Sequence, residues 1–153
     1  MKRDNIIDEI QEKDFIELQK ILKDALGKNI SYEKMQESYK ILINNKDTYI
    51  LGYYINDSLV GTVTLNILTL TSGKEAVIWD MAVKEEYRRL GIATKLMNKA
   101  EGIAKSYEDV TRIWLFSGFQ RKCAHKLYIK LGYDENRDKA FVKCNYIKTI
   151  RNS

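Results

Sequence analysis

The stretch VKEEYRRLGIA, residues 83–93, connects two segments with different hydrophobic patterns. Residues 76–83 are almost continuously apolar, which is typical of a strand that is buried on both faces. From Ile92 to Ala104, apolar residues recur at three- and four-residue spacing, which predicts an amphipathic helix. The stretch is therefore predicted to be a short basic loop that leads from a buried strand into the first turn of a helix.

This loop has the properties of an anion-binding site. The first amides of a helix have no partner within the helix, and the helix dipole is positive at that end. Gly91 has no side chain to obstruct a ligand, and Arg88 and Arg89 can bind phosphate oxygens through paired hydrogen bonds. We expect a diphosphate to bind the amides of residues 89–94. The alternative is an ordinary turn with two solvated arginines, since the better-known glycine-rich phosphate loops are absent.

Two further segments carry patterns of their own. In RKCAHKLYIKLGY, residues 121–133, apolar positions recur at helical spacing, and Gly132 lies where the helix should end. In NDSLVGTV, residues 56–63, turn residues precede strand-forming ones, which predicts a tight hairpin. Together with the basic loop, these segments resemble the GNAT superfamily of N-acetyltransferases over about residues 47–146.

Two motifs carry the resemblance. The phosphate loop of the superfamily reads Arg/Gln-x-x-Gly-x-Gly/Ala, which residues 88–93 match. Its later helix often reads Ala-x-x-Leu/Phe-Tyr-x-Lys-x-Gly-Phe/Tyr, which residues 124–133 match. The resemblance implies an enzyme that transfers the acetyl group of acetyl-coenzyme A to an amine.

The patterns predict a single α/β domain over residues 1–153. Strands are expected at 5–10, 48–55, 59–70, 75–83, 110–116 and 140–146, and helices ending at 26 and spanning 32–43, 92–106 and 120–131. A helix between strands 76–83 and 110–116 makes those strands parallel, with a right-handed crossover. The superfamily fold implies a mixed, mostly antiparallel twisted sheet around this one central parallel pair, with helices on both faces.

The resemblance also implies where acetyl-coenzyme A binds as co-substrate. The pantetheine arm is expected between strands 76–83 and 110–116, where it pairs with the backbone of Met81 and Val83. No metal is expected. The residues assigned to the coenzyme are Met81, Ala82, Val83, Arg88, Arg89, Leu90, Gly91, Ile92, Ala93, Thr94, Ser117 and Tyr128.

Two residues are candidates for catalysis. By the resemblance, the hydroxyl of Tyr128 faces the coenzyme sulfur and protonates the leaving thiolate; the alternative is a core tyrosine on an apolar helix face. Asp80 is the only acid in its strand core and is a candidate general base for the amine; the alternative is a buried structural carboxylate. Glu75 is a second choice of base, with a solvated strand end as its alternative, and ordered water is a third.

Other polar residues have weaker assignments. His125 is the single histidine, which excludes a His-based metal cluster, and we interpret it as a helix-surface or coenzyme-neighbour residue. Cys123 and Cys144 are expected to be small core residues. Ser117 and Gln120 are expected either to contact acceptor or coenzyme or to cap the following helix.

The acceptor is predicted to be a primary amine of a small molecule, held in a pocket built from residues 26–32 and 70–74. This pocket should contain Lys28, Asn29, Tyr32, Thr71, Ser72 and Lys74. One alternative acceptor is the N-terminus of a protein, because that subgroup shares the Tyr-x-Lys-x-Gly ending of residues 128–132. An alternative of another class is a non-catalytic coenzyme A-binding or regulatory module.

Composition restricts partners and location. The chain has 153 residues and a net charge of +5, but its basic residues are spread without an aromatic ladder, so nucleic acid is not the expected partner. No apolar run approaches the roughly 20 residues of a membrane span. Two cysteines do not make a disulfide framework, so a cytoplasmic, reduced protein is expected. A homodimer is left open.

Overall fold

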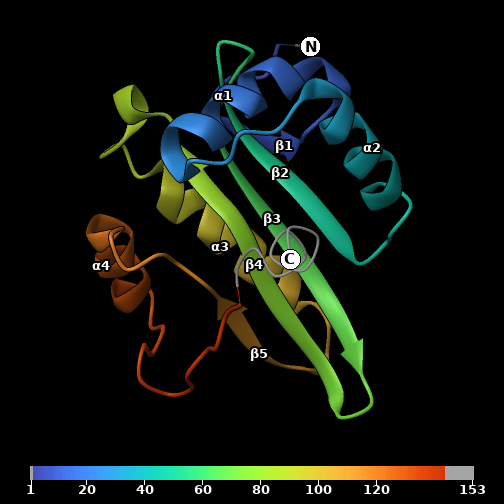
Figure 1. Ribbon diagram of the computed structural model, residues 1–153, viewed down its shortest axis with the longest axis vertical. Coiled ribbons are helices and arrows are strands. Elements are labelled where there is room, and N and C mark those ends of the chain that lie inside the picture. Colours follow the sequence, from blue (N-terminus) through green and yellow to red (C-terminus); the bar gives the residue numbers. More distant parts are fainter. Residues whose placement is uncertain (1, 144–153) are drawn as a thin grey trace, which may run out of the picture. The chain divides into compact units, whose positions relative to one another are not determined.

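The computed structural model describes residues 2–143, and the chain forms two compact units, Met1–Phe116 and Ser117–Ser153. The first unit contains a five-stranded sheet in the order β1-β2-β3-β4-β5 (Figure 1). Its strands are β1 (Ile6–Glu9), β2 (Thr48–Ile55), β3 (Ser58–Leu70), β4 (Gly73–Val83) and β5 (Val110–Leu115). Neighbouring strands are antiparallel except β4 and β5, which are parallel as predicted.

Helices cover both faces of this sheet, which confirms the expected fold class. Helices α1 (Phe15–Leu26) and α2 (Tyr32–Leu42) lie on one face, and α3 (Ile92–Lys105) lies on the other (Figure 1). A short 3-10 turn, Glu12–Asp14, precedes α1. A second one, Glu85–Tyr87, lies in the loop after β4. No helix among residues 2–143 combines the length and the apolar character needed to cross a membrane.

Local sequence signals explain several boundaries. Gly27 ends α1 in a left-handed conformation with φ +66°, and the Ser31 hydroxyl caps α2 by accepting from the Lys34 amide at 3.2 Å. Asn56 and Asp57 both have positive φ, as the tight turn between β2 and β3 requires. The predicted apolar stripe of α2 extends too far, since Ile43 is 57% exposed beyond the end of the helix.

The core beneath α1 and α2 places the loop that joins them. Buried residues of α1 and α2 pack against the sheet through Tyr54, Leu59 and Ala82. Phe15 makes edge contacts with the rings of Tyr32 and Tyr39 at centroid distances of 5.8 and 5.0 Å. The loop from Gly27 to Ser31 therefore emerges from a packed layer over the carboxyl half of β4.

The relation between β4 and β5 positions the candidate site. Their pairing ends at Ile78 opposite Leu115, while β4 continues to Val83 along β3. In the ladder with β3, Thr64 pairs with Trp79 and Thr62 with Ala82, so β4 has one extra residue there. That β-bulge contains Asp80, whose φ is +51°. The carboxyl end of β4 is thus bent and has no β5 partner.

The second unit contains α4 (Lys122–Lys130). Gly132 follows it with φ +95°, in agreement with the predicted helix end. The predicted strand 140–146 is wrong in its described part, because residues 140–143 form no strand, and residues 144–146 lie outside the described residues. A strand forms only when its backbone pairs with a neighbouring strand, and residues 140–143 have no such pairing.

Candidate active site

The loop between β4 and α3 exposes backbone donors. The first backbone hydrogen bond of α3 runs from the Lys95 amide to the Gly91 carbonyl at 3.1 Å. The amides of Ile92, Ala93 and Thr94 come before that bond and have no acceptor within the helix. They form a cluster of donors at the positive end of the helix dipole, where an anion is stabilised.

Backbone conformation at this loop leaves room for a ligand. Gly91 has φ +78°, and a Cβ built there meets no atom within 4 Å. Arg89 also has a left-handed conformation, with φ +64°, which the sequence pattern did not predict. Both Arg88 and Arg89 are exposed, and neither forms an ion pair within residues 2–143. The residues therefore fit a diphosphate, by geometry as well as by charge.

Arg88 joins this loop to the end of β4. Its Nε donates to the Val83 carbonyl at 3.1 Å, so the guanidinium is held beside the strand end. The Lys84 amide donates to the Val60 carbonyl of β3 at 2.9 Å. Because successive residues of a strand direct their backbone groups to opposite edges, Met81 and Val83 face away from β3, toward the edge that β5 has left. This is the edge along which the pantetheine arm was expected.

Asp80 lies at the start of that edge. Its carboxylate forms an ion pair with the Nζ of Lys28, from the loop between α1 and α2, and the Asp80 side chain is 32% exposed. Asp80 therefore has a partner, as the structural alternative required, but it is not the buried carboxylate that this alternative assumed. The bulge explains the difference, because the positive φ turns the side chain out of the regular alternation of the strand.

Glu75 is not a solvated strand end. It accepts from the Arg112 Nε at 2.8 Å and from the Trp114 indole Nε1 at 2.6 Å. The Arg112 guanidinium, together with the indole, lowers the pKa of Glu75 below its ordinary value. Glu75 is held by two donors on β5, whereas Asp80 pairs with one flexible lysine and lies at the bulge, with a more exposed side chain. The geometry therefore favours Asp80 over Glu75 as the residue that an amine can reach.

The two segments predicted to form one acceptor pocket do not come together. Lys28 reaches Asp80, but Lys74 lies at the start of β4, where it pairs with Asp109 at 3.3 Å. At about 3.3 Å per strand residue, the positions of Lys74 and Asp80 are roughly 20 Å apart. Thr71 and Ser72 form the hairpin tip at that remote end (Figure 1). Tyr32 packs on Phe15 instead of standing free in a pocket.

The second unit carries the other predicted residues. Tyr128 on α4 is buried and packs edge-on against Tyr133 at 6.2 Å between ring centroids. Burial raises the pKa of Tyr128, while the nearby Arg121 acts in the opposite direction. His125 Nε2 lies 3.1 Å from the Ser117 hydroxyl, so each has a partner within this unit.

Three assignments in the second unit need correction. The residue that precedes α4 is Arg121, with no side-chain cap, so neither Ser117 nor Gln120 caps the helix. Cys123 is exposed on α4 and is not a core residue, because it lies about 140° around the helix from the buried Tyr128. Cys144 lies outside the described residues. Among residues 2–143, no group of three or more His, Cys, Asp or Glu side chains is arranged to hold a metal ion.

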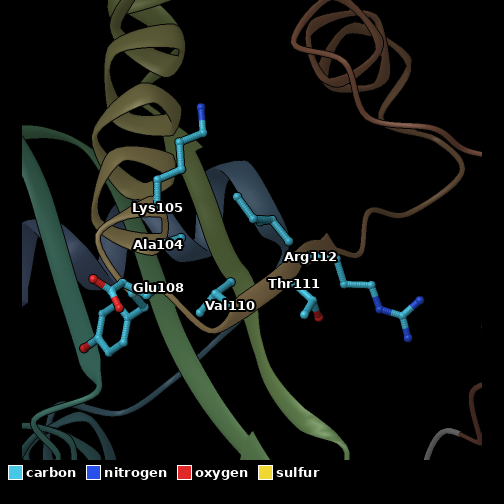
Figure 2. A pocket seen from close by; sticks show the side chains of 8 residues that line it. Ala104, Lys105, Glu108, Val110, Thr111 and Arg112 are labelled. Atoms are coloured by element: carbon cyan, nitrogen blue, oxygen red, sulfur yellow. The ribbon is translucent and has the colours of Figure 1, made fainter.

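A pocket elsewhere in the first unit contains none of the predicted site residues. It has a volume of about 290 Å³ and lies between the end of α3 and the start of β5, with the labelled side chains around it (Figure 2). Its lining residues are Ala104, Lys105, Tyr107, Glu108, Val110, Thr111, Arg112 and Ile113. An exposed aromatic surface at Trp79 and Phe116 was not predicted from the sequence. A large aromatic residue within the apolar run of β4 and another directly after β5 could have indicated it.

Comparison with known proteins finds related sequences and solved structures with a similar fold. The zebrafish (Danio rerio) protein N-alpha-acetyltransferase 50 is 30% identical over 97 residues, which are 63% of this chain, and the chain spans 55% of that relative's length. A transcriptional regulator from Bacillus halodurans superposes with a TM-score of 0.80 at 21% identity, over 90% of this chain and 98% of that one. Glucosamine-6-phosphate N-acetyltransferase from Arabidopsis thaliana superposes with a TM-score of 0.75 at 17% identity, over 90% of this chain and 96% of that one.

The sequence model of the acetyltransferase (GNAT) family matches residues 15–133, which include α1, the bulged strand β4, the basic loop and α4. The match thus covers most of the chain and every element that carries a predicted site residue. The chain belongs to the GNAT family of acetyltransferases.

Proposed function

We propose that the protein is an N-acetyltransferase that moves the acetyl group of acetyl-coenzyme A to the primary amine of a small molecule. The observation that carries this proposal is the donor cluster of Ile92–Thr94, which follows the part of β4 beyond its pairing with β5. These amides would hold the diphosphate of the coenzyme, and the backbone of Met81 and Val83 would hold its arm. When bound, acetyl-coenzyme A supplies the activated acetyl group as a thioester.

The residues of β4 then act on the amine. An alkylammonium has a pKa near ~10 and cannot attack until it loses a proton. Asp80, at the bulge where the edge begins, accepts that proton directly or through water and holds the amine in place. The amine nitrogen forms the new bond to the acetyl carbon as the carbon–sulfur bond breaks.

From the motif of residues 124–133, we infer that Tyr128 acts on the leaving sulfur. A tyrosine hydroxyl has an ordinary pKa near ~10 and is therefore protonated at neutral pH, and burial raises the pKa of Tyr128 further. The hydroxyl gives its proton to the departing thiolate and later recovers one from solvent. Arg88 holds the phosphate loop against the strand through its hydrogen bond to Val83 and binds a phosphate oxygen with its remaining donors.

Calorimetry with acetyl-coenzyme A, followed by assays of free thiol with a panel of amines, tests the proposal. We expect saturable binding of the coenzyme and amine-dependent thiol release. Binding without thiol release for any amine or peptide favours the non-catalytic module, and absence of binding contradicts both.

A second acceptor class has a specific observation in its favour. The similarity to an N-alpha-acetyltransferase over 97 residues makes a protein N-terminus the alternative acceptor. Peptides with free and with blocked N-termini, compared with small amines in the same assay, separate the two. A kcat/KM that is higher for free N-termini than for every small amine supports the alternative.

A further inference from the structure

An aromatic surface borders the place where β4 and β5 separate. The last paired position is Ile78 of β4 opposite Leu115 of β5. Trp79 and Phe116 are the next residues along the chain after these two. Their rings stack across the opening with centroids 5.7 Å apart and planes 28° apart. Trp79 is 42% exposed and Phe116 is 50% exposed, so both rings offer surface to a ligand.

The far end of this surface is anchored by charge. The ring of Phe116 stacks on Trp114 at 6.3 Å, and the Arg112 guanidinium lies over Trp114 at 4.3 Å. Glu75 binds both Arg112 and the Trp114 indole. Trp114 is therefore held on β5, and the rings of Trp79 and Phe116 continue from it as a preformed stack, the aromatic platform.

The platform faces the same side as the candidate base. Thr64 pairs with Trp79, and Thr62 pairs with Ala82, which packs under α1 and α2. Thr62 and Thr64 are two residues apart in β3 and therefore share a face of the sheet, and paired residues of neighbouring strands lie on the same face. Trp79 is thus on the same face as Ala82, the face covered by α1 and α2. Lys28 reaches Asp80 from the loop between those helices, so the Asp80 carboxylate is accessible from this face.

We propose that Trp79 and Phe116 select the acceptor, and that it is an amine joined by a short chain to a flat aromatic ring. This inference rests on the proposed function. The ring of the acceptor stacks on the platform while its ammonium group replaces Lys28 at the Asp80 carboxylate. Charge complementarity supports this occupant, because a cation is attracted both to the carboxylate and to aromatic ring faces.

The experiment compares three amines of similar size with the full chain: 2-phenylethylamine, 2-cyclohexylethylamine and n-hexylamine. We expect kcat/KM to be about tenfold higher for the flat ring, the discrimination that a stacking contact of about 1.4 kcal/mol provides. Trp79→Ala and Phe116→Ala should each remove most of that preference by raising KM, and Trp79→Phe should retain it.

Leu70→Ala is the matched control, because Leu70 is 46% exposed on the same sheet at the distant hairpin end. The inference is overturned if kcat/KM is equal for the flat and the saturated amines, or if Trp79→Ala and Leu70→Ala have equal effects. Either outcome leaves the proposed function intact, provided that acetyl-coenzyme A binds and aliphatic amines react. Absence of coenzyme binding in calorimetry overturns the proposed function as well. Quenching of tryptophan fluorescence by 2-phenylethylamine alone, lost in Trp79→Phe, is an expected readout that needs no turnover.

Discussion

The carboxylate of Asp14 is bound at both oxygens by the guanidinium of Arg3, whose Nη1 and Nη2 donate at 3.2 and 2.8 Å. The two side chains are only 8% and 3% exposed. Asp14 also accepts from the Tyr54 hydroxyl and the Gln11 amide, at 2.8 and 2.9 Å. Arg3 thereby attaches the start of the chain to the core beneath α1.

Removal of one partner of this pair should destabilise the fold strongly. Arg3→Met leaves a buried carboxylate without its counter-charge, so the free energy of unfolding should fall by about 3–5 kcal/mol in urea titrations. Lys34→Met is the control, since the pair of Lys34 with Glu37 is 76% and 69% exposed and should contribute under ~1 kcal/mol. Equal losses in the two variants would contradict the importance of the buried pair.

The same carboxylate should make stability depend on acid pH. Burial alone raises the pKa of Asp14, but hydrogen bonds from Arg3, Gln11 and Tyr54 outweigh it and leave the pKa below its ordinary value. Its contribution is therefore complete above the unfolded value of about 3.9 and is lost as pH falls through the lower folded value. Urea titrations below pH 4 should show a steeper loss in the wild type than in Asp14→Asn.

Asp80 and Lys28 should have opposite effects on amine acetylation. Asp80→Asn should lower kcat by about 10²–10⁴-fold with little change in the Kd for acetyl-coenzyme A, because the base acts only on the amine. Lys28→Ala removes a competitor for the carboxylate, so KM for the amine should decrease. Steady-state kinetics with calorimetry measures both, and an unchanged kcat in Asp80→Asn assigns the proton to water.

Gly91→Val should weaken binding of acetyl-coenzyme A by more than tenfold, because a branched side chain occupies the space over the amides of α3. Gly73→Val is the matched control: Gly73 also has positive φ and open space, but lies at the β3–β4 hairpin tip. Both variants should lose stability, whereas only Gly91→Val should raise the Kd in calorimetry. A similar Kd for the two variants places the diphosphate elsewhere.

Tyr128→Phe distinguishes a general acid from a packing residue. Loss of the hydroxyl should lower turnover by about 10²–10⁴-fold while the Kd for acetyl-coenzyme A and the Tm hardly change. Tyr133→Phe, which keeps the edge contact between the two rings, serves as the comparison. Near-normal turnover in Tyr128→Phe, with the chemical step shown to limit the rate, excludes the acid role and leaves the family unchanged.

Local patterns in the sequence determined most elements of the first unit. The apolar run of β4, the glycines at positions 27 and 91 and the turn at Asn56 and Asp57 each act over a few residues, so the sequence alone indicated them. The parallel pairing of β4 and β5 also followed, since a helix between two strands leaves few alternatives. The donor cluster at the start of α3 was also predictable, because it consists of the first amides of one helix. Its binding of a diphosphate stays a prediction.

Long-range contacts decided what the sequence did not indicate. The bulge at Asp80 depends on the register between β3 and β4, and the partner of its carboxylate, Lys28, is 52 residues away in the chain. The separation of Lys74 from Asp80 likewise appears only when β4 is laid out as one long strand. Periodicity reports which face a residue occupies, but only the packed tertiary structure determines which distant side chains meet on that face.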